Sequence, residues 1–130
     1  MATVNEELAR FLCSKRQFSI ENKRVKHGAF LPHKGATSVF MVVGLAISEM
    51  WDIGQAHVVE ASGRTLHGCA LIMMEHVREC GLELDPDNVP PRHASIVGWP
   101  SSKGEQKLRA MDLAARATLR LPFPLLASES

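Results

Sequence analysis

The stretch TSVFMVVGL, residues 37–45, is the clearest strand in this sequence. It is rich in β-branched and apolar residues. Its apolar residues run without the polar alternation of a half-exposed edge strand, which predicts a strand inside a sheet. The next segment, 47–61, carries apolar residues along one helical face, and Gly63 is expected to stop that helix. A buried strand followed directly by an amphipathic helix predicts a sheet with helices packed on it.

On both sides of this stretch the sequence alternates between strand-like and helix-like segments. Further strands are expected at 64–72, 82–85 and 93–99. Helices are expected at 3–13, 73–80 and 101–121, and the first and last of these begin with capping-box spacing. We therefore predict an α+β fold, with a small sheet of three to five strands covered by three to four helices in a single domain.

The length of 130 residues fits one domain, which we place at 1–121. Residues 122–130 contain two prolines that cannot continue a helix, and they are expected to form a C-terminal tail. In residues 14–36 the apolar residues follow neither a helical nor a strand period, which predicts a long, ordered basic loop with a short strand at 29–32. A loop of this length inside a compact domain is usually functional or mobile.

Composition and charge indicate in which compartment the protein works and which partners to expect. The net charge of +1 favours neither nucleic acid nor a membrane by itself. The longest apolar run, 39–47, is far shorter than the roughly 20 residues of a membrane span, so no membrane partner is expected. Three cysteines cannot all pair within one chain, which indicates free thiols in the cytoplasm. No cofactor is expected, and a homo-oligomer stays open.

The segment RHASIVGWPSSKGEQ, residues 92–106, is a candidate anion site. Ser101, Ser102 and Lys103 fall where a helix is expected to begin, and free backbone N–H groups there attract an anion. The pattern lacks the glycine-lysine-hydroxyl ending of a Walker loop. Capping of the helix by Ser102 explains the same serines without a ligand.

The same segment contains a His-x-Ser element at His93 and Ser95, whose side chains are expected to share one face of a strand. Some phosphodiesterases hold their substrate between two such elements and use each histidine to transfer a proton. His93 is therefore a candidate catalytic residue. The sequence has no second copy, and His93 is alternatively a hydrogen-bonded core or interface residue.

The segment 67–80 contains ligand types suited to zinc. His67 and Cys69 are expected on a strand, and His76 and Cys80 on a helix, which together supply two nitrogens and two sulfurs. The spacing does not match the usual zinc motifs, and free cysteines are commonly buried. Buried thiols and surface histidines are the favoured interpretation, so no metal is predicted.

The basic loop is the strongest candidate for ligand binding. Between residues 10 and 34 the sequence has seven lysines and arginines and one acid, Glu21. Arginine binds phosphate through two parallel N–H groups, which makes Arg16 and Arg24 the best candidates, with Lys26 beside them. The alternative is a solvated loop that Phe18 and Phe30 attach to the core.

Together these features predict a small cytoplasmic domain that binds a phosphate-bearing ligand, either nucleic acid or a nucleotide. The predicted contact residues are Arg16, Arg24, Lys26, Ser101, Ser102 and Lys103. Two other functions remain open from the sequence. One is a phosphodiesterase or nucleotide-processing enzyme that depends on His93, and the other is a protein-interaction subunit with an adaptable, methionine-rich surface.

Overall fold

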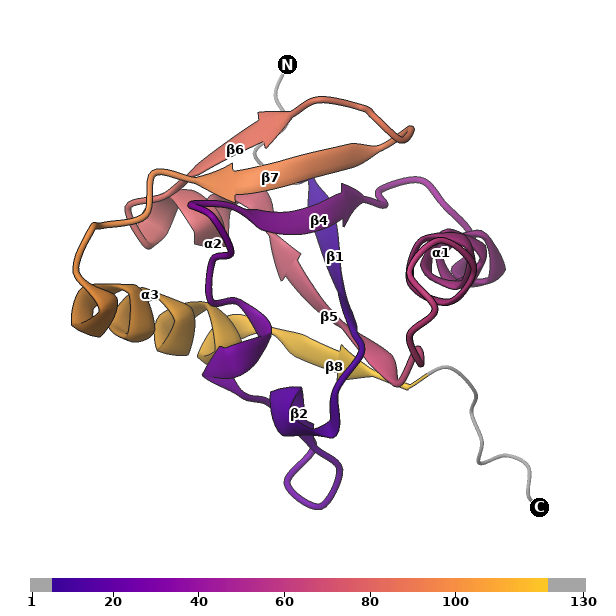
Figure 1. Cartoon of the computed structure of the whole chain (residues 1–130), viewed down its shortest axis with the longest axis horizontal. Coiled ribbons are helices and arrows are strands. Elements are labelled where there is room, and N and C mark those ends of the chain that lie inside the picture. Colours follow the sequence, from indigo (N-terminus) through magenta and orange to yellow (C-terminus); the bar gives the residue numbers. More distant parts are fainter. Residues whose placement is uncertain (1–5, 122–130) are drawn as a thin grey trace.

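The computed structural model describes residues 6–121 and is built around a six-stranded antiparallel sheet (Figure 1). The strand order is β6-β7-β4-β1-β5-β8. These strands are β1 Glu7–Leu12, β4 Thr37–Met41, β5 Gly68–Met73, β6 Glu83–Pro86, β7 His93–Val97 and β8 Thr118–Arg120. Two shorter strands, β2 Phe18–Ser19 and β3 Arg24–Val25, form a separate two-stranded ribbon.

The predicted sheet of three to five strands covered by three to four helices is wrong. The large sheet has six strands, and residues 6–121 contain three α-helices: α1 Ile47–Gly54, α2 Met74–Glu79 and α3 Lys103–Arg116. With six residues α2 has fewer than two turns, and α1 and α3 are the two longer helices on the sheet. The prediction had too few strands because it assigned two of them to helices.

The first of these two strands is β1, which lies in the segment predicted as a helix at 3–13. Leu8 and Leu12 belong to one core cluster, whereas Ala9 and Phe11 belong to the cluster on the opposite face. A segment that is apolar on both faces has no strand-like alternation, and its residues also fit a helical pattern. Pairing with β4 and β5 makes β1 a central strand.

The second is β8, which lies at the end of the helix predicted at 101–121. The helix α3 ends at Arg116, because Ala117 is extended, and the chain then pairs with the free edge of β5. The strand predicted at 29–32 is also wrong, since a single helical turn, His27–Ala29, leads into the fully buried Phe30. Residues 122–130, the predicted tail, lie outside the described residues.

The other predicted elements are confirmed, with shifted ends. The predicted strands at 37–45, 64–72, 82–85 and 93–99 correspond to β4, β5, β6 and β7. The helix predicted at 47–61 is α1 continued by a π-helical segment, Gln55–Glu60. The chain leaves this segment at Gly63, whose φ of 68° is the left-handed conformation expected of a helix stop.

The helices lie on opposite faces of the sheet, as Figure 1 shows for α1 and α3. On one face, Ala110 and Leu113 of α3 pack against Leu8 and Leu12. On the other face, Met50 of α1 and the π-helical segment cover Phe11 and Phe40. Within residues 6–121, no helix has the length and apolar character needed to cross a membrane.

The pairing of β8 with β5 makes Gly68 sensitive to substitution. A Cβ atom on Gly68 would lie 2.8 Å from the backbone oxygen of Arg120, so Gly68→Ala must push β8 away. We expect the free energy of unfolding, measured in urea, to fall by about 1–3 kcal/mol. Gly104→Ala is the matched control, because its nearest new contact, with Ser102 Oγ at 3.7 Å, is ordinary. Equal stability of the two variants would contradict the pairing.

Candidate functional site

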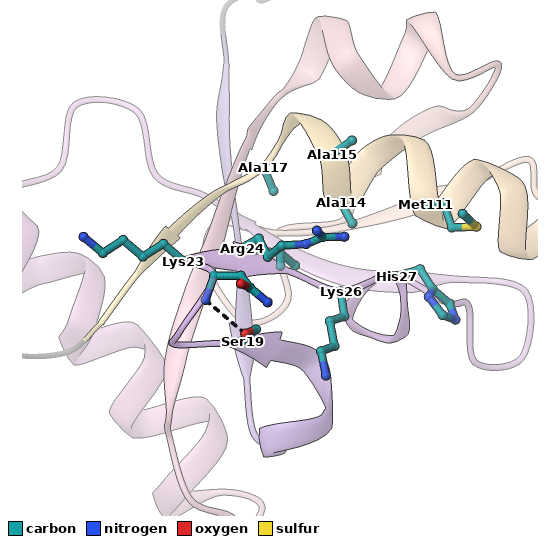
Figure 2. A pocket seen from close by; sticks show the side chains of 11 residues that line it. Ser19, Lys23, Arg24, Lys26, His27, Met111, Ala114, Ala115 and Ala117 are labelled. Atoms are coloured by element: carbon teal, nitrogen blue, oxygen red, sulfur yellow. Dashed lines mark hydrogen bonds between the residues drawn. The ribbon is translucent and has the colours of Figure 1, made fainter.

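A groove of about 860 Å³ separates the β2–β3 ribbon from α3 (Figure 2). One wall carries polar and basic side chains, and the other is formed by small and apolar side chains of α3 and the residue after it. The lining residues are Ser19, Asn22, Lys23, Arg24, Val25, Lys26, His27, Met111, Ala114, Ala115 and Ala117. The groove therefore joins cationic groups to an apolar surface.

Alternating burial gives the basic wall its orientation. Val25 is buried in the core that faces α3, whereas its neighbours Arg24 and Lys26 are exposed. Side chains two apart in an extended segment lie on the same side, so anchoring Val25 directs Arg24 and Lys26 outward together. Farther along, Arg10 donates from Nε to the backbone oxygen of Ala29 at 2.7 Å and attaches the segment to the sheet.

The cations at the groove have no acidic partner in the part of the chain that the structure describes. Lys23, Arg24 and Lys26 form no ion pair among residues 6–121, whereas Arg116 pairs with both Glu79 and Asp112. Unpaired cationic groups beside an apolar wall favour an anionic ligand, because no neighbouring carboxylate cancels their positive electrostatic potential.

Only part of the predicted phosphate site comes together in this groove. Arg24 and Lys26 line it, but Arg16 lies in the helical turn Lys15–Gln17 and is not among the lining residues. Lys103 begins α3 and lies about 12 Å along the helix axis from Met111, at about 1.5 Å per residue.

At that end of α3 the serines have a structural role. Ser102 is the N-cap, and its Oγ accepts a hydrogen bond from the backbone N–H of Glu105 at 3.3 Å. This is the capping alternative given by the sequence. Ser101 and Lys103 are exposed beside the cap and remain predicted anion contacts.

Sequence reasoning missed the wall that α3 contributes to the groove. Met111 is one of its residues, and 47% of its surface is exposed. Ala114 and Ala115 follow at helical spacing and line the same groove. Lys23 and His27 were within the basic loop, but nothing in the sequence placed them opposite a helix.

His93 lies on the other face of the sheet, away from this groove. Its ring packs edge-on against Phe40 of the α1 core at a centroid distance of 5.3 Å, whereas α3 packs on the opposite face. His93, Arg24 and Lys103 therefore do not share one concave surface. His93 and Ser95 do share a face, because they pair with Phe40 and Ser38 of β4.

His93 makes two hydrogen bonds that its local sequence does not reveal. Its Nε2 lies 2.6 Å from Oγ of Ser38, and its Nδ1 lies 2.8 Å from Oδ1 of Asp87. Ser38 is 55 positions away along the chain, so only the pairing of β4 with β7 brings the two together. Ser38 is the functional candidate that sequence reasoning missed.

The ionisation of Asp87 determines how the neutral histidine ring is oriented. The hydrogen bond from His93, reinforced by one from the backbone N–H of Val89, lowers the pKa of Asp87. An ionised carboxylate only accepts, so Nδ1 of His93 carries the proton. In the neutral ring Nε2 is then an acceptor, and the Ser38 hydroxyl donates to it.

The four candidate zinc ligands are not assembled into one site. Cys69 is buried in the α1 core and Cys80 in the α3 core, on opposite faces of the sheet. Burial raises the pKa of Cys69 to about 12, and burial with a hydrogen bond to Asp112 raises that of Cys80 to about 11. Among residues 6–121, no three His, Cys, Asp or Glu side chains are arranged to hold a metal.

The described residues thus present two candidate sites on opposite faces of the sheet. One is the groove with Arg24 and Lys26, and the other is the hydrogen-bonded set of Ser38, His93 and Asp87. No family model, curated protein or solved structure matches the chain.

His57 of the π-helical segment gives the stability of the fold a testable pH dependence. Burial, followed by the nearby charges of His93 and Arg10, lowers the pKa of His57 below its ordinary value. The unfolded chain therefore takes up a proton at His57 at higher pH than the folded chain, so acidification favours unfolding. From about pH 7.5 to about pH 5.5, wild type should lose more unfolding free energy than His57→Gln. Urea unfolding across this range measures the difference, and parallel pH profiles would contradict the shift.

Proposed function

We propose that this domain binds a phosphate-bearing ligand, a nucleotide or a short segment of nucleic acid, in the groove between β3 and α3. The supporting observation is that Lys23, Arg24 and Lys26 lie together at the groove without an ion-pair partner among the described residues. The planar guanidinium of Arg24 suits two phosphate oxygens at once, whereas each lysine acts as a point charge.

The wall opposite these cations suits the remainder of a nucleotide. Met111, Ala114 and Ala115 offer a surface of small and flexible apolar groups on which a base or sugar can pack. The volume of about 860 Å³ falls within the range of small-molecule sites. His27 is the aromatic ring at this groove, and the chain contains no tyrosine, which disfavours a platform that stacks several bases.

The length of the ligand decides whether the other predicted contacts take part. A ligand that stays inside the groove does not reach Lys103, about 12 Å from Met111 along α3, or Ser101 and Ser102, which precede the helix. An extended nucleic-acid strand that follows α3 can reach them, and Arg16 near the ribbon can contact it on the other side. A nucleotide and a nucleic acid are therefore distinguished by their dependence on Lys103.

We also propose that the protein works in the reducing cytoplasm. Cys13, Cys69 and Cys80 are free thiols in the structure. Cys69 and Cys80 lie in cores on opposite faces of the sheet, so they cannot form a disulfide without unfolding.

Removal of one groove cation tests the binding site. We expect Arg24→Ala and Lys26→Ala each to weaken binding of ADP, or of a short single-stranded oligonucleotide, by about tenfold. Isothermal titration at several salt concentrations should show a salt slope smaller by about one for each variant with the oligonucleotide. Arg78→Ala is the matched control, because Arg78 is exposed on α2 and does not line the groove. If Arg24→Ala bound both ligands as tightly as wild type and the Arg78→Ala control do, the proposal would be contradicted.

Lys103→Ala separates the two ligand classes. If the physiological ligand is an extended nucleic acid, this variant should weaken oligonucleotide binding several-fold and leave ADP binding unchanged, since Lys103 lies outside the groove. Titrations of the same preparation with both ligands measure this. Loss of ADP binding in Lys103→Ala would place the nucleotide at the start of α3 rather than in the groove.

A further inference from the structure

The face of the sheet opposite the groove carries a hydrogen-bonded chain of three side chains. Ser38 Oγ lies 2.6 Å from Nε2 of His93, and Nδ1 of the same ring lies 2.8 Å from Oδ1 of Asp87. A hydroxyl on one ring nitrogen and a carboxylate on the other is the arrangement that activates a serine nucleophile. We propose that Ser38, His93 and Asp87 form a hydrolytic centre that cleaves small carboxylic esters through an acyl-serine intermediate.

Each member of the chain is held by backbone pairing. Ser38 lies in β4 directly opposite Ser95, and His93 begins β7 opposite Phe40. Asp87 lies in the turn before β7, where its N–H donates to the backbone oxygen of His93 and its Oδ1 accepts from Val89. Side chains carried by paired strands and a hydrogen-bonded turn keep their geometry better than side chains on free loops.

The histidine ring is fixed on its remaining side by aromatic packing. His93 and His57 both pack edge-on against Phe40, at centroid distances of 5.3 and 4.9 Å. Burial lowers the pKa of His57, so this neighbouring ring is neutral at pH 7. His93 thus has a carboxylate on one ring nitrogen, a hydroxyl on the other and two aromatic rings beside it.

None of the three side chains belongs to a fully buried residue. Ser38 is partly exposed, and 13% of the His93 side chain and 49% of the Asp87 side chain are accessible. On this face the α1 core covers Phe11 and Phe40, and Asp85 and Asp87 near the β6–β7 edge of the sheet are exposed. The hydrogen-bonded chain is thus part-buried at Ser38 and His93 and exposed at Asp87.

The chemistry follows from the direction of the two hydrogen bonds. Ser38 Oγ forms a bond to the ester carbonyl carbon while its proton moves to Nε2 of His93. Collapse of the tetrahedral adduct breaks the ester C–O bond, and the departing alcohol takes that proton. Water then attacks the acyl-serine and gives one proton to His93, which returns it to Ser38 as the carboxylic acid leaves. Asp87 is a positioning residue that orients the ring and stabilises its cation.

The proposal is tested by covalent labelling of the full chain with a fluorophosphonate. The Ser38 oxygen displaces fluoride from phosphorus, and peptide mass spectrometry identifies the modified serine. We expect modification of Ser38 and none of Ser95, which shares its face but makes no side-chain hydrogen bond to His93 among the described residues. Comparing two serines of one molecule keeps the result independent of how any variant folds. Labelling of neither serine, or of both equally, would overturn the proposal.

Hydrolysis of p-nitrophenyl acetate adds the kinetic test. Wild type should release a rapid burst of p-nitrophenol as the acyl-serine forms, and Ser38→Ala should abolish both this burst and the later turnover. Asp87→Asn should lower kcat/KM by about 10³–10⁴-fold, because the His93 ring loses its orientation. Ser95→Ala and Asp85→Asn, on the same face and the same hairpin, should keep the wild-type rate. A folded Ser38→Ala with the wild-type rate, or an Asp87→Asn rate equal to that of Asp85→Asn, would overturn it.

Discussion

Burial of strand β1 on both of its faces is the constraint on which the rest of the structure depends. Leu8 and Leu12 point into one core, and Ala9 and Phe11 point into the other. Antiparallel sheets often leave one face to water, but both faces of this central strand are covered. It therefore needs α3 on one side and α1 on the other, which Figure 1 shows on either side of the strands.

Both candidate sites lie where this cover ends. On one side the β2–β3 ribbon meets α3 and leaves the groove with Arg24; on the other, α1 leaves the strand pair β4–β7 partly open at Ser38. Arg10 of β1 connects the two regions, since its Nε donates to the backbone oxygen of Ala29 and its Nη1 donates to the backbone oxygen of Ser38. Binding and hydrolysis are consequently proposed for separate faces that share one scaffold.

The helices and strands whose apolar residues follow a clear helical or strand spacing were predicted from the sequence. The prediction failed where pairing between distant strands determined the structure. The apolar run of β4 and the helical segments of α1 and α3 were predictable from local spacing. The spacing did not give the buried face of each helix, since Ile47, Leu108 and Met111 are exposed. Strand β1 is apolar on both faces and rich in helix-forming residues, and β8 forms because β5 has a free edge. The neighbours of Arg24 on α3, and Ser38 beside His93, are distant in sequence, so no local pattern indicates either.

Mapping the bound ligand by NMR tests the central claim, that the groove between β3 and α3 is the phosphate-binding site. Titration of the ¹⁵N-labelled protein with ADP should shift amide resonances within residues 19–27 and 111–117, the two segments that contain the groove-lining residues. The amides around Lys103 and those on the opposite face, around Ser38 and His93, should stay unchanged. Shifts centred on Lys103 or on Ser38, with none at the groove, would contradict the account.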